Sequence, residues 1–100
     1  MHRATEARNE IGPLLDRLIT QLESEGSATQ SAYFNRIRRT LCAVNNDLEL
    51  TTPIVELSTA PVVGFRFSHD ADALIDRILV KVAQLAQELE TITPVTPDYQ

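Results

Sequence analysis

The chain has 100 residues, of which 43% are hydrophobic and 23% are charged, and its formal net charge at pH 7 is −5. This length provides for one small domain with one core, and the acidic balance argues against a protein that coats nucleic acid or an anionic membrane. The absence of a long apolar run argues against a membrane span or a secretory signal, and Cys42, the only cysteine, excludes an intrachain disulfide or a paired-cysteine site.

The first segment with a helical pattern runs from about Asn9 to Glu25. Its apolar residues recur at intervals of three and four, and polar residues fill the opposite side. These apolar residues are Ile11, Leu14, Leu15, Leu18, Ile19 and Leu22. Because proline suits the first turn of a helix but kinks its interior, we expect a firm start near Pro13, preceded by a frayed or kinked turn.

A tight corner and a second helix follow. Gly26 is suited to the left-handed conformation that ends a helix, and residues 27–30 have the Ser-x-x-Gln form of a capping box. The second helix is predicted over about Ala28 to Asp47, antiparallel to the first because the connection is short. Its apolar stripe comprises Phe34, Ile37, Leu41, Val44 and Leu48.

The helical pattern disappears from Glu49 to Phe67. Pro53 and Pro61 interrupt the segment, and β-branched and aromatic residues dominate in 54–55 and 62–67. We predict two short extended pieces joined by a turn at 58–61, forming a β-ribbon that lies on the helices or pairs with the ribbon of another chain. In the alternative interpretation, residues 54–59 form a single helical turn.

The last helix has the clearest pattern. A polar cap at Ser68 and acidic residues in the first turn suit a helix start, and the helix is predicted to reach about Glu90 or Ile92. Together with neighbouring apolar positions, a heptad seam covers more than half of its circumference. The seam comprises Ala71, Ile75, Ile78, Val82, Leu85, Leu89 and Ile92. Residues 93–100, with two prolines, are predicted to form a mobile tail.

These elements predict a mainly α fold: one domain over residues 1–100, built as a three-helix antiparallel bundle with a short β-ribbon between the second and third helices. One neighbouring helix cannot cover the apolar seam, so we expect a homodimer. Its expected interface comprises Ile75, Ile78, Val82, Leu85, Leu89, Val63, Phe65 and Phe67. The alternative is a monomer in which the ribbon covers the last helix.

Three groups of residues are candidate sites. The basic residues of the second helix and two acidic residues of the last helix are predicted partner-binding residues: Arg36, Arg38, Arg39, Asp72 and Asp76. Helical spacing separates Arg36 from Arg38 by about 200°, which argues against one phosphate-binding patch. His69, Asp72 and Asp76 share a helix side but lack further metal ligands, and a Cys42–His69 pair is the remaining nucleophilic combination.

These observations favour a non-catalytic, cytoplasmic protein-interaction module: a small acidic homodimer that acts as an adaptor, assembly factor or regulator of a larger protein. We expect no cofactor and no nucleic-acid or membrane partner. One alternative is a neutralising, antitoxin-like protein that blocks a basic cleft. Its acidic surface would comprise Asp70, Asp72, Asp76, Glu88 and Glu90. The other alternative is a small-ligand or metal-binding domain with a pocket near Tyr33, His69 and Asp72.

Overall fold

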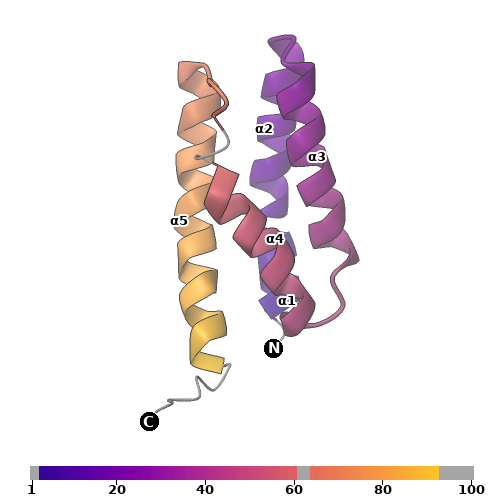
Figure 1. The fold of residues 1–100 in the computed structure, drawn as a ribbon, viewed down its shortest axis with the longest axis vertical. Helices are drawn as coiled ribbons and strands as arrows, with labels where there is room; N and C mark the ends of the chain where they lie inside the picture. The colour runs from indigo at the N-terminus through magenta and orange to yellow at the C-terminus, as the bar shows by residue number, and fades with distance from the viewer. Residues whose placement is uncertain (1–2, 61–63, 93–100) are drawn as a thin grey trace.

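The computed structural model describes residues 3–60 and 64–92, without the side chains of 90–92. This part of the chain contains five helices: α1 (Arg3–Glu10), α2 (Gly12–Ser24), α3 (Ala28–Ala43), α4 (Asp47–Thr59) and α5 (His69–Ile92). Helices α2 and α3 lie side by side, and α4 crosses diagonally between α3 and α5 (Figure 1). Apolar side chains from all five helices meet in one core.

The corner between α2 and α3 confirms most of the prediction for this region. Gly26 has a φ of 76°, the left-handed conformation expected after a helix end. Ser27 occupies the N-cap position of α3, but its side chain makes no capping hydrogen bond. The amide of Gln30 donates instead to the backbone oxygen of Arg66 at 2.9 Å, so it links α3 to the segment before α5.

Helix α1 replaces the frayed turn expected before Pro13. Its buried face consists of two alanines, Ala4 and Ala7, so its apolar pattern is weak although both residues are completely enclosed. Two polar contacts fix the helix. The Arg8 guanidinium donates to the backbone oxygen of Val44 at 2.7 Å, and the backbone N–H of Ala4 donates to Asp47 at 3.3 Å.

The predicted β-ribbon is wrong: residues 47–59 form helix α4, and no strand occurs among the described residues. Asn46 caps this helix by accepting a hydrogen bond from the Glu49 N–H at 2.9 Å, and the Glu49 carboxylate accepts one from the Asn45 N–H at 2.8 Å. Pro53 lies inside the helix, where it removes one backbone donor. It is buried in the core beside three apolar residues at helical spacing: Leu50, Ile54 and Leu57.

The N-cap of α4 gives a direct test that residues 47–59 form a helix. We expect Asn46→Ala to lower the free energy of unfolding by about 1 kcal/mol, because it removes the side-chain acceptor of the Glu49 N–H. Asn45→Ala is the matched control, since Asn45 contributes only its backbone N–H to the cap. Urea unfolding of both variants measures the difference, and equal losses would contradict a helix that begins at Asp47.

The segment before α5 has no regular secondary structure over residues 64–68. Ser68 then caps α5, as predicted, by accepting from the Ala71 N–H at 3.1 Å. The Ser68 hydroxyl donates to the Glu25 carboxylate at 2.5 Å, and this bond, with a second from Gln21, lowers the pKa of Glu25. The end of α5 at Ile92 also agrees with the prediction. Residues 61–63 and the predicted tail at 93–100 lie outside the described residues.

Candidate functional site

Most of the heptad seam of α5 is enclosed by the chain itself, and the side chain of its last residue, Ile92, lies outside the described part of the chain. Ile75, Ile78, Val82 and Leu85 are each at most 6% exposed, and Leu89 packs against the same core while half-buried. Helices α2 and α4 contact α5 and supply this cover. Because the chain itself buries these residues, their apolar character no longer gives a reason to place a subunit interface there.

The aromatic residues proposed for the interface also pack within the chain. Phe65 and Phe67 are half-buried and join Tyr33 and Phe34 of α3 in an aromatic cluster. The ring centroids of Tyr33 and Phe65 are 5.3 Å apart and those of Phe34 and Phe67 are 6.0 Å apart. The cluster attaches the segment before α5 to α3. The predicted interface residue Val63 lies outside the described residues.

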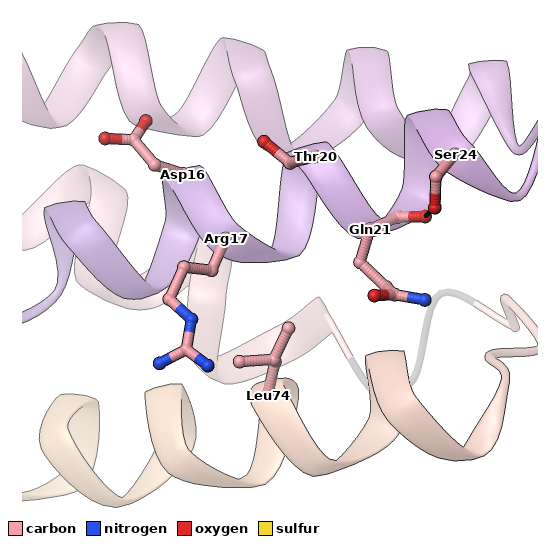
Figure 2. Close-up of a pocket in the computed structure, with 6 residues that line it drawn as sticks. All are labelled: Asp16, Arg17, Thr20, Gln21, Ser24 and Leu74. Carbon is pink, nitrogen blue, oxygen red and sulfur yellow. Dashed lines mark hydrogen bonds between the residues drawn. The ribbon is translucent and has the colours of Figure 1, made fainter.

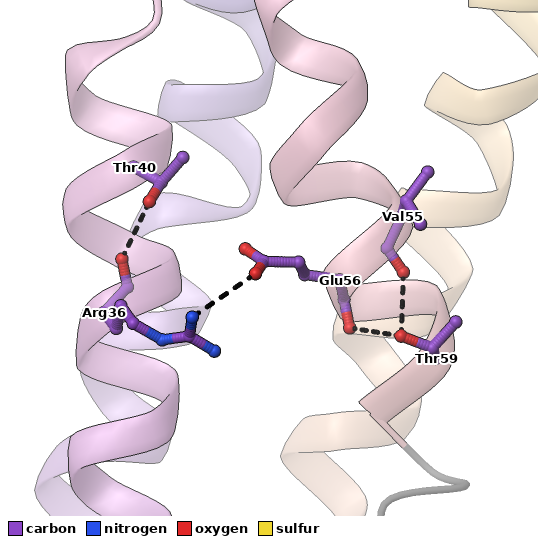
Figure 3. Close-up of polar contacts among 5 residues, drawn as sticks. All are labelled: Arg36, Thr40, Val55, Glu56 and Thr59. Carbon is purple, nitrogen blue, oxygen red and sulfur yellow. Dashed lines mark hydrogen bonds and ion pairs between the residues drawn. The ribbon is translucent and has the colours of Figure 1, made fainter.

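The three arginines of α3 do not form one patch. Arg38 pairs with Asp16 of α2, which raises the pKa of this guanidinium, chiefly through their hydrogen bond. Arg36 pairs with Glu56 of α4 at 3.6 Å (Figure 3). Arg39 is exposed, and none of the described carboxylates pairs with it. The separation of Arg36 from Arg38 agrees with their helical spacing.

The acidic and nucleophilic candidates remain apart. His69, Asp72 and Asp76 are all exposed at the start of α5, and the described residues contain no group of three metal-ligating side chains. Cys42 is exposed near the end of α3, whereas His69 begins α5, and these two helix ends lie well apart along the long axis of the molecule (Figure 1). The structure therefore brings no Cys42–His69 pair together.

An uncharged surface on α4 was missed by the sequence analysis. Leu48 is 81% exposed and Val55 is 52% exposed, and the two residues lie on one side of α4. Thr52 and Thr59 are exposed on the same side. We call these four residues the α4 outer face. Leu48 was assigned to the buried stripe of the second helix, but α3 ends at Ala43 and places Leu48 on the next helix.

Two hydroxyl groups on or beside this face bond to the backbone of their own helices. Thr59 donates to the backbone oxygens of Val55 and Glu56, both at 3.1 Å, and Thr40 of α3 donates to the Arg36 oxygen at 3.1 Å. Val55 points away from α3, whereas Glu56 reaches across to Arg36 (Figure 3). A shallow cavity of about 250 Å³ adjoins the face and is lined by Thr40, Ala43, Val44, Glu49 and Thr52. The surface thus combines exposed methyl groups with few free polar groups.

A second candidate surface is the groove between α2 and α5, which we call the α2–α5 groove. One part of it has a volume of about 360 Å³ and lies where Arg17 of α2 reaches toward α5 and Leu74 points back toward α2 (Figure 2). The adjoining part, of about 400 Å³, also contacts Arg17 and adds Arg77 and Lys81 of α5. Spacing within single helices could not reveal this site, because it joins residues of α2 and α5.

No model of a known protein family matches the chain, and no curated protein or solved structure is similar enough to count as a relative. In the part of the chain that the structure describes, none of the helices has both the length and the apolar character needed to cross a bilayer. A function for the chain therefore has to be inferred from its own surface.

Proposed function

We propose that the chain is a non-catalytic protein-interaction module that pairs reversibly with a second copy through the α4 outer face. The observation that carries this proposal is the exposure of Leu48 and Val55 on one uncharged side of α4. Large apolar side chains that gather on one face, instead of lying scattered, are characteristic of interaction surfaces. We place this module in the cytoplasm, where a single exposed cysteine stays reduced.

The α4 outer face suits a two-fold contact. Leu48 and Val55 are seven residues apart, which corresponds to about 10.5 Å along the helix axis. A two-fold axis that passes near Thr52 brings Leu48 of one copy opposite Val55 of the other, and the reverse contact follows by symmetry. Repulsion between copies is limited because the neighbouring Glu56 carboxylate is already paired with Arg36.

The energetics favour a reversible dimer over an obligate one. Full burial of a Val or Leu side chain contributes roughly 1.5–3 kcal/mol, and the two-fold contact buries two copies of each residue. Association costs an estimated ~4–15 kcal/mol in lost translational and rotational freedom. Because these quantities are similar in size, we expect dimerisation to depend on concentration.

The test compares two valines with similar exposure on different helices. We expect Val55→Glu to raise the dimer dissociation constant about tenfold or more, because it places charges in an apolar contact. Val80→Glu is the matched control, since Val80 is 58% exposed but lies on α5, away from the proposed contact. Sedimentation equilibrium measures the mass of each protein over a concentration series.

The wild type and Val80→Glu are expected to rise from 11.2 kDa toward twice that mass, while Val55→Glu remains near 11.2 kDa. Far-UV circular dichroism checks that both variants keep the helical content of the wild type. A wild type that stays monomeric at every concentration would refute the dimer. A dimer lost in Val80→Glu but kept in Val55→Glu would move the contact from α4 to α5.

A further inference from the structure

The α2–α5 groove contains an uncompensated pair of positive charges. The third cation of the groove is neutralised, because Lys81 of α5 pairs with Glu10 of α1 at 3.0 Å within the same cavity. Farther along α5, Glu88 pairs with Arg3 of α1, also at 3.0 Å. Arg17 and Arg77 line the same cavity from opposite helices, and both are exposed. None of the carboxylates in residues 3–60 and 64–89 pairs with either guanidinium.

The groove continues on both sides of these arginines as a hydrogen-bonding surface. Thr20, Gln21 and Ser24 line one part, and Asn9 lines the other. Each part also contains one carboxylate that is already paired with a cation: Asp16 with Arg38, and Glu10 with Lys81. From Pro13 to Ser24 the lining of α2 extends over about 16 Å, at 1.5 Å per residue. An extended peptide of about five residues has this length. The groove therefore offers two unpaired cations, with neutral hydrogen-bonding groups on both sides and carboxylates that are already neutralised by ion pairs.

We propose that the α2–α5 groove binds an acidic segment of a partner protein, with side-chain carboxylates held between Arg17 and Arg77. A planar guanidinium makes two parallel hydrogen bonds to a carboxylate, and a carboxylate between two facing arginines relieves their repulsion. Asn9 in one part of the groove and Thr20 in the other can bond the backbone of such a segment, whereas the Gln21 amide and the Ser24 hydroxyl already donate within α2 and its C-cap. This site is separate from the α4 outer face, so it goes beyond the proposed dimer and does not depend on it.

The shape and charge of the molecule favour a peptide over other anions. Both cavities are shallow, so a small anion there stays largely in water, whereas small-molecule sites usually enclose most of their ligand. A nucleic acid presents a long row of phosphates that the net charge of −5 repels. A short acidic segment matches the two unpaired arginines without bringing a larger charge against the acidic remainder of the surface.

The experiment measures binding of a fluorescein-labelled oligoglutamate peptide by fluorescence anisotropy, with an oligoglutamine peptide of the same length as the uncharged control. The groove variant is Arg17→Glu/Arg77→Glu. The matched variant is Arg39→Glu/Arg66→Glu, which replaces two other exposed arginines that pair with no described carboxylate. Each double variant has the same net charge, −5 − 2 × 2 = −9, so only the position of the charges differs.

We expect the groove variant to weaken oligoglutamate binding by about tenfold or more relative to the matched variant. Thermal unfolding of both proteins checks that neither substitution disrupts the fold. Equal weakening in the two variants would show general attraction and overturn the proposal, as would failure of oligoglutamate to bind the wild type more tightly than oligoglutamine. Tighter binding of a labelled single-stranded oligonucleotide than of oligoglutamate would also overturn it. None of these results depends on dimerisation.

Discussion

Val82→Asp is expected to unfold the chain, whereas Val80→Asp leaves it folded. Val82 is 1% exposed and lies in the core, so an aspartate there buries a carboxylate without a partner. Such burial costs several kcal/mol, which is comparable to the ~5–15 kcal/mol that stabilises a typical small protein. Val80 is 58% exposed on the same helix, and its replacement by aspartate costs at most about 0.5 kcal/mol.

Circular dichroism at 222 nm during thermal unfolding distinguishes the two variants. The Val80→Asp protein is expected to melt cooperatively near the wild-type midpoint, and the Val82→Asp protein to show no cooperative transition. The difference between the two melting curves tests whether the apolar seam of α5 is buried within a single chain. A Val82→Asp protein that melts like the wild type would mean that α2 and α4 do not enclose this seam.

The aromatic cluster is expected to give the second large effect. Phe34 is 1% exposed, and its ring lies 5.1 Å from that of Tyr33 and 6.0 Å from that of Phe67. Truncation of a buried phenylalanine to alanine costs about 3–5 kcal/mol, through lost burial and the cavity left behind. For a chain of this size, the loss lowers the melting temperature of Phe34→Ala on the order of 20 °C.

Phe65→Ala is the matched control for this prediction. Phe65 belongs to the same cluster but is only half-buried, so its truncation removes less apolar area from the interior. We expect a loss of stability clearly smaller than that of Phe34→Ala, as measured by urea unfolding. A larger loss in Phe65→Ala would place the centre of the cluster outside α3.

Sequence patterning predicts the helices with strong apolar periodicity. The leucine and isoleucine stripe of α2 and the Phe34–Ile37–Leu41 stripe of α3 lie in the core as expected. The apolar seam of α5 was expected at a dimer interface, but its residues from Ala71 to Leu85 lie in the core of the chain itself. The ends at Gly26 and Ser68 are also predictable, because a left-handed glycine and a hydroxyl cap each satisfy backbone groups locally. These elements depend mainly on interactions within a few residues of the chain.

Helix α4 is harder to predict because its local signals conflict. Pro53 and the β-branched residues around it disfavour a helix interior, whereas the core requires Leu50, Ile54 and Leu57 on one side. Tertiary burial decides the outcome. A usable signal was present in Asn46 and Glu49, whose spacing is that of a capping box. The sequence prediction placed Asn46 at the end of the preceding helix and Glu49 at the start of a segment without helical pattern.

The error at α4 also explains why the apolar surface of α5 was predicted to need a second chain. Without a helix at 47–59, only one neighbour was available to cover the broad apolar surface of α5, and a second chain was invoked to bury the remainder. In the structure, α4 and α2 both pack against α5. Leu48 and Val55 remain outside the core, and they are exposed only because α4 is a helix with one buried side. The α4 outer face could therefore not be predicted from a sequence interpretation in which residues 47–59 do not form a helix.

The most direct test of the proposed association is a dilution series followed by two-dimensional ¹H–¹⁵N NMR. We predict that the amide signals of Leu48, Thr52, Val55 and Thr59 shift progressively as the protein concentration rises. The signals of Ala73, Val80 and Ala83, on the exposed side of α5, are expected to stay constant. Concentration-dependent shifts confined to α5, or constant signals throughout α4, would contradict pairing through the α4 outer face.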